Sequence, residues 1–154
     1  MLFRSIVANA DSEINGLTDL DPARTAIVDK RFESDLTGFQ PSQDSSASIK
    51  FISEAPDHLA YETKSAVKQL AVFSEIYYDK GWNAYVDGKL MPHFRANYVL
   101  RAMIVPEGNH KIEFKFEPAN YYKAEKVSLA GSVLIVLLFA GYGVSLLRRK
   151  PESA

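Results

Sequence analysis

The sequence contains no cysteine, which excludes disulfide bonds, thiolate metal sites and cysteine nucleophiles. It also lacks any large excess of one charge: 18 basic and 19 acidic residues give a net charge of −1. A nucleic-acid-binding surface needs clustered cations to neutralise phosphates, so we expect no nucleic-acid partner. A Gly-rich phosphate loop, a G-x-S-x-G motif and an H-E-x-x-H motif are absent as well, so no familiar catalytic signature is present.

Groups that could hold a metal are equally sparse. The three histidines, His58, His93 and His110, lie far apart, and no two have the spacing that places imidazoles on one face of a strand or helix. We therefore expect no metal site and no cofactor. Carboxylates are frequent but show no distinctive pair. An enzyme such as a glycosidase, whose two carboxylates come from distant strands, stays an open alternative from the sequence.

One long apolar segment dominates the chain. Residues 127–147, VSLAGSVLIVLLFAGYGVSLL, contain no charge, proline, asparagine or glutamine. As a helix this segment is about 31 Å long, which matches the roughly 30 Å hydrocarbon core of a bilayer. The segment is therefore predicted to span a membrane, with the lipid bilayer as its first partner. Small residues within it, such as Gly131 and Ser132, would suit neighbouring transmembrane helices as further partners.

The flanks of this segment predict its orientation. Tyr121 and Tyr122 precede it, where an aromatic belt would meet the headgroups. Lys123 and Lys126 lie before the segment, whereas residues 148–150, RRK, follow it at once. By the positive-inside rule the tail is cytoplasmic and the rest of the chain lies outside. The first residues, MLFRSIVANA, lack the apolar run of a secretory signal. Either the domain is cytoplasmic and tail-anchored, or the chain is the end of a longer protein.

The residues between 23 and 118 show the pattern of an antiparallel β protein. Short runs with period two recur every 8 to 12 residues, most clearly HKIEFKFE at 110–117, with turn signals such as Asp87-Gly88 between them. Residues 70–78 are apolar at successive positions, as in a strand covered on both faces. The predicted fold is a β-sandwich of the immunoglobulin-like or jelly-roll kind. The expected order is a helical or turn-rich lead-in (1–22), an extracytoplasmic sandwich (23–118), a juxtamembrane connector (119–126), the transmembrane helix (127–147) and a basic cytoplasmic tail (148–154).

Aromatic and polar residues gather in the second half of the sandwich sequence. Rings stack on sugar faces while polar groups bind hydroxyls, so this mixture is typical of a carbohydrate-binding face. The candidate carbohydrate-binding residues are Tyr78, Trp82, Arg95, Asn97 and Arg101. The alternative is that Trp82 and several tyrosines belong to the sandwich core, and that the arginines pair with nearby carboxylates. We expect no catalytic residue in this chain.

The run FSEIYYDKGWNAYVDGKLMPHFRANYVLRAMIVPEGNHKIEFKFEP, followed by one helix and a basic tail, resembles the C-terminal end of the bacterial YfhO family of membrane proteins. The earlier run DSEINGLTDLDPARTAIVDKRFE is similar to the family's segment before this domain. The resemblance implies a large polytopic protein, similar to C-type glycosyltransferases that use lipid-linked sugars and act on cell-surface glycopolymers. It also implies that upstream helices, absent here, carry the catalytic acidic residues and deliver the sandwich outside the bacterial cytoplasmic membrane.

These expectations give one leading hypothesis and three alternatives. The leading hypothesis is a non-catalytic, membrane-anchored sandwich that assists a glycosyltransferase-like membrane protein, either by positioning an acceptor glycan or by bracing its helices. The first alternative is a stand-alone, membrane-tethered carbohydrate-binding module. The second is a structural or interaction domain with no ligand, and the third is an enzyme in its own right.

Overall fold

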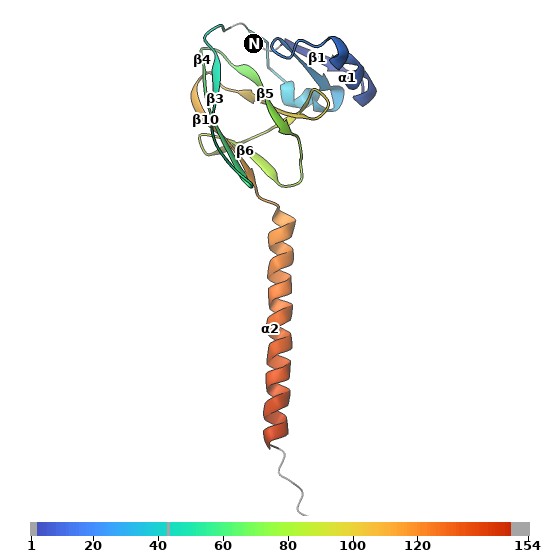
Figure 1. Cartoon of the computed structure of the whole chain (residues 1–154), viewed down its shortest axis with the longest axis vertical. Helices are drawn as coiled ribbons and strands as arrows, with labels where there is room; N and C mark the ends of the chain where they lie inside the picture. Colours follow the sequence, from blue (N-terminus) through green and yellow to red (C-terminus); the bar gives the residue numbers. More distant parts are fainter. Residues whose placement is uncertain (1–2, 43, 149–154) are drawn as a thin grey trace, which may run out of the picture. The chain divides into compact units, whose positions relative to one another are not determined.

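The computed structural model describes residues 3–42 and 44–148. The chain divides into two compact units, Met1–Glu117 and Pro118–Ala154, which are described separately (Figure 1). The first unit holds every strand, and the second holds the long helix α2. Both parts of the predicted fold class, a mainly antiparallel β domain and a C-terminal apolar helix, are confirmed.

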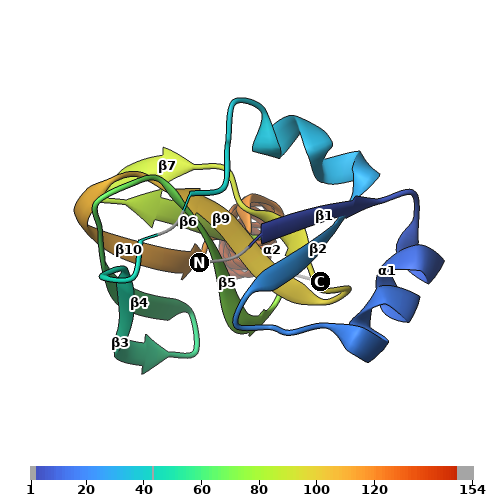
Figure 2. The same cartoon turned by 90° about the horizontal axis from the view of Figure 1, so that it is seen from above.

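Two antiparallel sheets form the sandwich in the first unit (Figure 2). The larger sheet contains, in spatial order, β3 (Ser48–Ala55), β4 (His58–Ser65), β10 (Gly108–Phe116), β6 (Trp82–Val86) and β7 (Lys89–Met91). The smaller sheet contains β5 (Gln69–Ile76), β9 (Leu100–Val105) and β8 (Phe94–Ala96). Because side chains alternate along a strand, each sheet turns one set toward the other. The core between the sheets contains Leu59, Phe73, Ala84, Val86, Met103, Val105, Ile112 and Phe114.

A second core covers the outer face of the smaller sheet. It is built by the N-terminal elements, which are β1 (Phe3–Val7), α1 (Ala10–Gly16), η1 (Leu17–Asp19), β2 (Thr25–Asp29) and η2 (Lys30–Leu36). Leu70 of β5 belongs to this second core, whereas Phe73 of the same strand belongs to the first. β5 is therefore covered on both faces, as its apolar sequence predicted.

The N-terminal region differs from the expected lead-in. Besides the helix α1 it contains the strand β1, which pairs with β2 in parallel, and α1 lies in the connection between them. The sequence FRSIV is short and does not alternate cleanly, so nothing in it indicates a strand. Its partner β2 follows a helix, because parallel strands need a crossover connection. A pairing between strands so far apart in the sequence leaves no local pattern that could predict it.

The turn at Asp87-Gly88 has the predicted conformation. Both residues have positive φ, 49° and 80°, as a type I′ turn requires. Two short strands follow this turn: β7 pairs with β6, and β8 pairs with β9 in the other sheet. Pro92 lies between them and has no N–H to donate to a ladder, so the chain leaves one sheet there and enters the other.

The second unit is the helix α2 (Ala119–Arg148). Within it, Ala124–Ser145 is long and apolar enough to cross a membrane, with a mean hydropathy of 2.2, and it agrees with the predicted span. Residues 119–126, expected as a connector, are its first turns. Arg149 and Lys150 of the predicted basic tail lie outside the described residues.

Candidate functional site

Arg101, one of the five candidate residues, lies inside the sandwich. It is 2% exposed, and its guanidinium carbon is 4.6 Å from the ring centre of Trp82 and 4.5 Å from that of Phe114. Its Nη2 donates to the carbonyl oxygen of Ile76 at 3.2 Å, while Nε and Nη1 have no hydrogen-bond partner among the described residues. The two aromatic faces stabilise a cation that is otherwise costly to bury. Arg101 is thus placed to hold Trp82 rather than to face solvent.

Arg95 and Asn97 contact the N-terminal elements instead. Arg95 Nη2 donates to Oε2 of Glu13 at 2.6 Å and lies 3.6 Å from Oδ2 of Asp29. The Asn97 side chain is buried, and its Oδ1 accepts from the N–H of Ile27 at 2.8 Å. These contacts join β8 and the following turn to α1 and β2. Both side chains therefore already have partners within the fold.

Glu13 is the residue of this cluster that the sequence analysis missed. It is fully buried, and its Oε1 accepts from the N–H of Tyr98 at 2.9 Å, while its Oε2 receives Arg95. Tyr98 has a positive φ of 71°, which is uncommon for a residue with a side chain, and the Glu13 bond fixes its N–H in that turn. No local signal marks Glu13, because its partners are more than 80 residues away.

Tyr78 and Trp82 are the two candidates with exposed ring surface. Tyr78 is 49% exposed and lies in the connection between β5 and β6. Trp82 begins β6 and is part-buried, because its ring also packs against Phe116 at 5.5 Å. The structure therefore brings Trp82 and Arg101 together, places Arg95 and Asn97 elsewhere and leaves Tyr78 exposed. Carbohydrate binding by these residues stays a prediction, and its accessible part is Tyr78 with the outer edge of Trp82.

His93 is a part-buried residue whose Nε2 lies inside the protein. Its ring lies 5.5 Å from Tyr77 and 6.1 Å from Phe114, and its Nε2 has no partner among the described residues. Burial disfavours the imidazolium form and the Arg101 charge repels it, which together lower the pKa of His93 to about 4. His93 is consequently neutral at physiological pH.

His110 has the opposite environment at the far end of the sandwich. Its Nδ1 lies 2.6 Å from Oδ2 of Asp87 and its Nε2 lies 2.7 Å from the carbonyl oxygen of Glu107. Both ring nitrogens face acceptors, so the protonated ring fits this site best. The Asp87 hydrogen bond is the main cause that raises the pKa of His110 above its ordinary value of 6.5. Among the described residues, no group of three or more His, Asp or Glu side chains is arranged to hold a metal ion.

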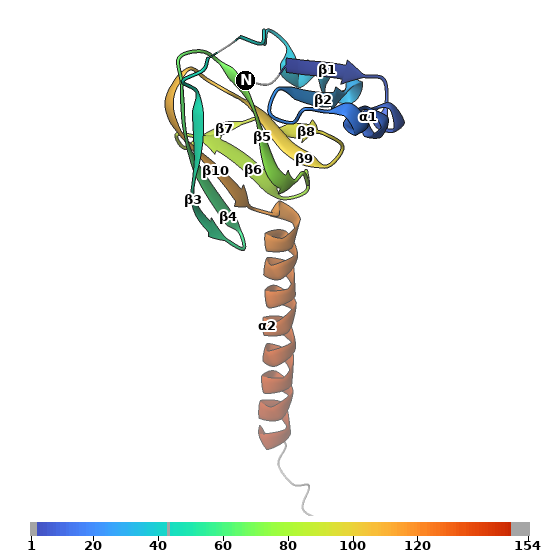
Figure 3. The ribbon, with the colours of Figure 1, turned by 45° about the horizontal axis from the view of Figure 1, so that its top comes forward.

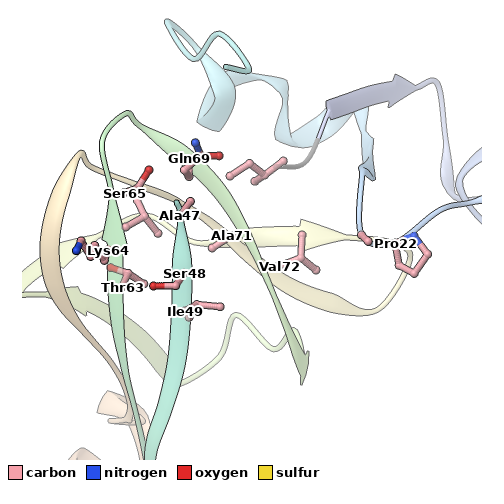
Figure 4. A pocket seen from close by; sticks show the side chains of 13 residues that line it. Pro22, Ala47, Ser48, Ile49, Thr63, Lys64, Ser65, Gln69, Ala71 and Val72 are labelled. Carbon is pink, nitrogen blue, oxygen red and sulfur yellow. The ribbon is translucent and has the colours of Figure 1, made fainter. Parts of the chain in front are cut away.

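A groove of about 210 Å³ opens between β3 and β4 on one side and β5 on the other (Figure 4). Ile49, Ala71 and Val72 supply apolar surface, and Thr63, Ser65 and Gln69 add polar groups. None of the five candidate residues lines this groove. The fold therefore offers a cleft that is separate from the aromatic patch which the sequence indicated.

The sequence of the chain matches a known protein family. The family model described as bacterial membrane protein YfhO matches residues 36–128. The chain belongs to the YfhO family. The YfhO match begins at the end of η2, covers β3 to β10 and continues into α2, so it includes most of the sandwich and leaves out β1, α1 and β2. No curated protein and no solved structure matches the chain.

Proposed function

We propose that this chain is a non-catalytic, membrane-anchored β-sandwich that forms the C-terminal part of a polytopic YfhO-type membrane protein. The complete protein resembles transferases that use lipid-linked sugars, and the sandwich assists the glycosylation of cell-surface glycopolymers from the outer side of the bacterial cytoplasmic membrane. The observation that carries this proposal is the unbroken YfhO match from β3 into α2. A sandwich and an apolar helix that belong to one family unit are expected to work together at a membrane.

The surface of α2 supports the membrane part of the proposal. Within Ala124–Ser145 none of the apolar window is buried inside the protein. A helix that is apolar on all sides is stable only when lipid or other helices cover it. Neighbouring transmembrane helices of the same assembly are the partners that suit this surface, and they would hold the sandwich close to them.

The internal contacts of three candidate residues favour a bracing role over glycan binding through these three side chains. Arg95, Asn97 and Arg101 have internal partners, as described above, so they are unavailable to a substrate. In the leading proposal the sandwich positions an acceptor glycan or braces the helices of its partner, and the chemistry occurs elsewhere.

This function is tested in a bacterium that carries the gene. Deletion should reduce the sugar content of the surface glycopolymers, and the complete gene should restore it. A version that encodes the same protein without the sandwich, residues 36–117, should restore it poorly. Normal sugar content in the deletion strain would contradict the proposal.

A stand-alone carbohydrate-binding module is the second candidate, and the exposed ring of Tyr78 beside Trp82 favours it. For this candidate, the purified chain in lipid nanodiscs should bind glycans, and Tyr78→Ala should abolish binding while the circular dichroism spectrum stays unchanged. Leu90→Ala is the matched control, because Leu90 is 60% exposed and belongs to β7. Binding that survives Tyr78→Ala would exclude this ring as the site.

A further inference from the structure

The connection between β5 and β6 lies at the end of the sandwich where the chain leaves β10. Phe116, the last residue of β10, is opposite Trp82, the first residue of β6. The N–H of Glu117 donates to the carbonyl oxygen of Gly81 at 2.6 Å. We call this end of the sandwich the exit end, and the start of β6 and the end of β10 lie together there (Figure 3).

Exposed apolar side chains gather at the exit end. Ile76 is 73% exposed, Tyr78 is 49% exposed and Val99 is 46% exposed. The backbone segments that carry them lie side by side, because the N–H of Tyr77 donates to the carbonyl oxygen of Val99 and Ile76 pairs with Leu100. Exposure of isoleucine, valine and tyrosine side chains to water is unfavourable, so this patch indicates a surface that contacts another molecule.

The opposite end of the sandwich has a different character. Its turns expose Asp87 with Gly88 and Glu107 with Gly108, and Lys89 follows the first of them. These charged and small residues are ordinary for turns in water. Exposed apolar side chains also occur elsewhere, at Leu90 in β7 and at Ile49, Phe51 and Ile52 in β3. The patch at the exit end differs from these because it lies where the chain leaves the sandwich toward α2.

The covalent chain limits how far the exit end can be from the bilayer. Pro118 is the single residue between Glu117 and the first residue of α2, Ala119. The apolar span begins at Ala124, which is about 8 Å further along the helix. The headgroup layer on each side of a bilayer is itself about 5–8 Å thick. Chain connectivity therefore keeps Glu117 within reach of the headgroups.

We propose that the surface formed by Ile76, Tyr78 and Val99 contacts the bilayer at the level of the lipid headgroups. Tyrosine suits that layer because its ring is apolar and its hydroxyl remains hydrated. Asp79 and Lys80, both exposed in the same connection, supply opposite charges that match the phosphate and ammonium of zwitterionic lipids. The contact requires α2 to cross the membrane, but it does not depend on any role in glycosylation.

The absence of cysteine makes a direct test possible. The complete chain carrying Tyr78→Cys is labelled with a polarity-sensitive fluorophore and reconstituted into vesicles of phosphatidylcholine and phosphatidylglycerol. Lys89→Cys is the matched control, because Lys89 is exposed at the opposite end of the sandwich, and Leu137→Cys within the apolar span is the lipid control. We expect the label at position 78 to emit at shorter wavelength than the label at 89, and lipids brominated near the headgroup to quench it.

A second measurement needs no substitution. Trp82 is the one tryptophan of the chain, so intrinsic emission reports the exit end alone. The same brominated vesicles should reduce this emission relative to vesicles of the unbrominated lipids. Emission of the position 78 label equal to that of the position 89 label, with no bromine quenching, would overturn the proposal. Tyr78 would then be free in water for a glycan.

Discussion

At the scale of single residues, the buried Arg101 is the most informative side chain. Its cation lies between two aromatic rings, and no carboxylate within ion-pair distance is found among the described residues. Because the indole and phenyl faces contribute attraction in a desolvated site, Arg101 contributes to stability through packing and cation–π contact together. The residue that looked like a ligand contact from the sequence therefore organises the interior around Trp82.

Replacement of Arg101 tests this role. Arg101→Ala should lower the free energy of unfolding by roughly 2–4 kcal/mol, because it removes the cation–π contacts and leaves a cavity. Arg24→Ala, at a side chain that is 80% exposed, should change it by less than about 0.5 kcal/mol. Urea unfolding of residues 1–117 measures both. Equal values for the two variants would show that Arg101 is not part of the packed interior.

His93 and His110 should make the free energy of unfolding depend on pH in opposite directions. His93 is neutral in the fold and takes up a proton more readily when unfolded, so its contribution to stability falls as pH decreases from 6.5 toward about 4. His110 has a raised pKa, so its contribution is complete below 6.5 and is lost as pH rises through that raised value. An NMR titration should show one ring titrating near 4 and another above 6.5, and Asp87→Asn should bring the second back toward 6.5. Titration of all rings near 6.5 would contradict both environments.

At the scale of elements, the Glu13–Arg95 pair joins α1 to the smaller sheet. Arg95→Ala leaves the fully buried carboxylate of Glu13 without its cation, so it should cost roughly 3–5 kcal/mol. Glu13→Ala should cost less, because Arg95 keeps Asp29 at 3.6 Å and is 19% exposed. The double variant should cost clearly less than the sum, since both remove the same contact. Urea unfolding of the unchanged protein, the two single variants and the double variant measures the coupling energy between the two side chains. Additive losses would mean that the two side chains act independently and that other contacts hold α1 in place.

Most sandwich strands were predictable because local pattern determines them. In β10 the alternation of apolar and charged residues follows directly from one buried and one exposed face, and at Asp87-Gly88 the turn chemistry fixes the register. β1 was not predictable, because its pairing depends on β2 beyond a helix. The switch of the chain at Pro92 from one sheet to the other also follows from tertiary packing, which a period-two pattern does not report.

The candidate site was less predictable than the strands. Polar and aromatic residue types indicated a binding face, but the side of the sheet on which each residue lies determines whether it is exposed. Arg101 packs against Phe114 in the core between the sheets, whereas Arg95, its partner on the neighbouring strand, binds Glu13 of the N-terminal elements. Glu13, which accepts a hydrogen bond from Arg95, is 82 residues away from it in the chain. Long-range contacts thus determine the partners of these side chains, and carbohydrate binding at Tyr78 and Trp82 stays a prediction.

At the scale of the whole molecule, the chain combines a β-sandwich with an apolar helix in one YfhO unit. The account proposed here places the sandwich outside the cytoplasmic membrane and the C-terminus inside. The positive-inside rule predicts this orientation from the basic residues after the span, and it would give the sandwich access to surface glycopolymers.

The most direct measurement is therefore the side of the membrane on which the sandwich lies. Single cysteines are introduced as Lys89→Cys in the sandwich and as Ala154→Cys at the C-terminus, and spheroplasts with a sealed membrane are treated with a membrane-impermeant maleimide. The account predicts that the cysteine at 89 reacts at once and that the cysteine at 154 reacts only after lysis. Reaction at 154 with protection at 89 would place the sandwich in the cytoplasm and contradict the proposed function.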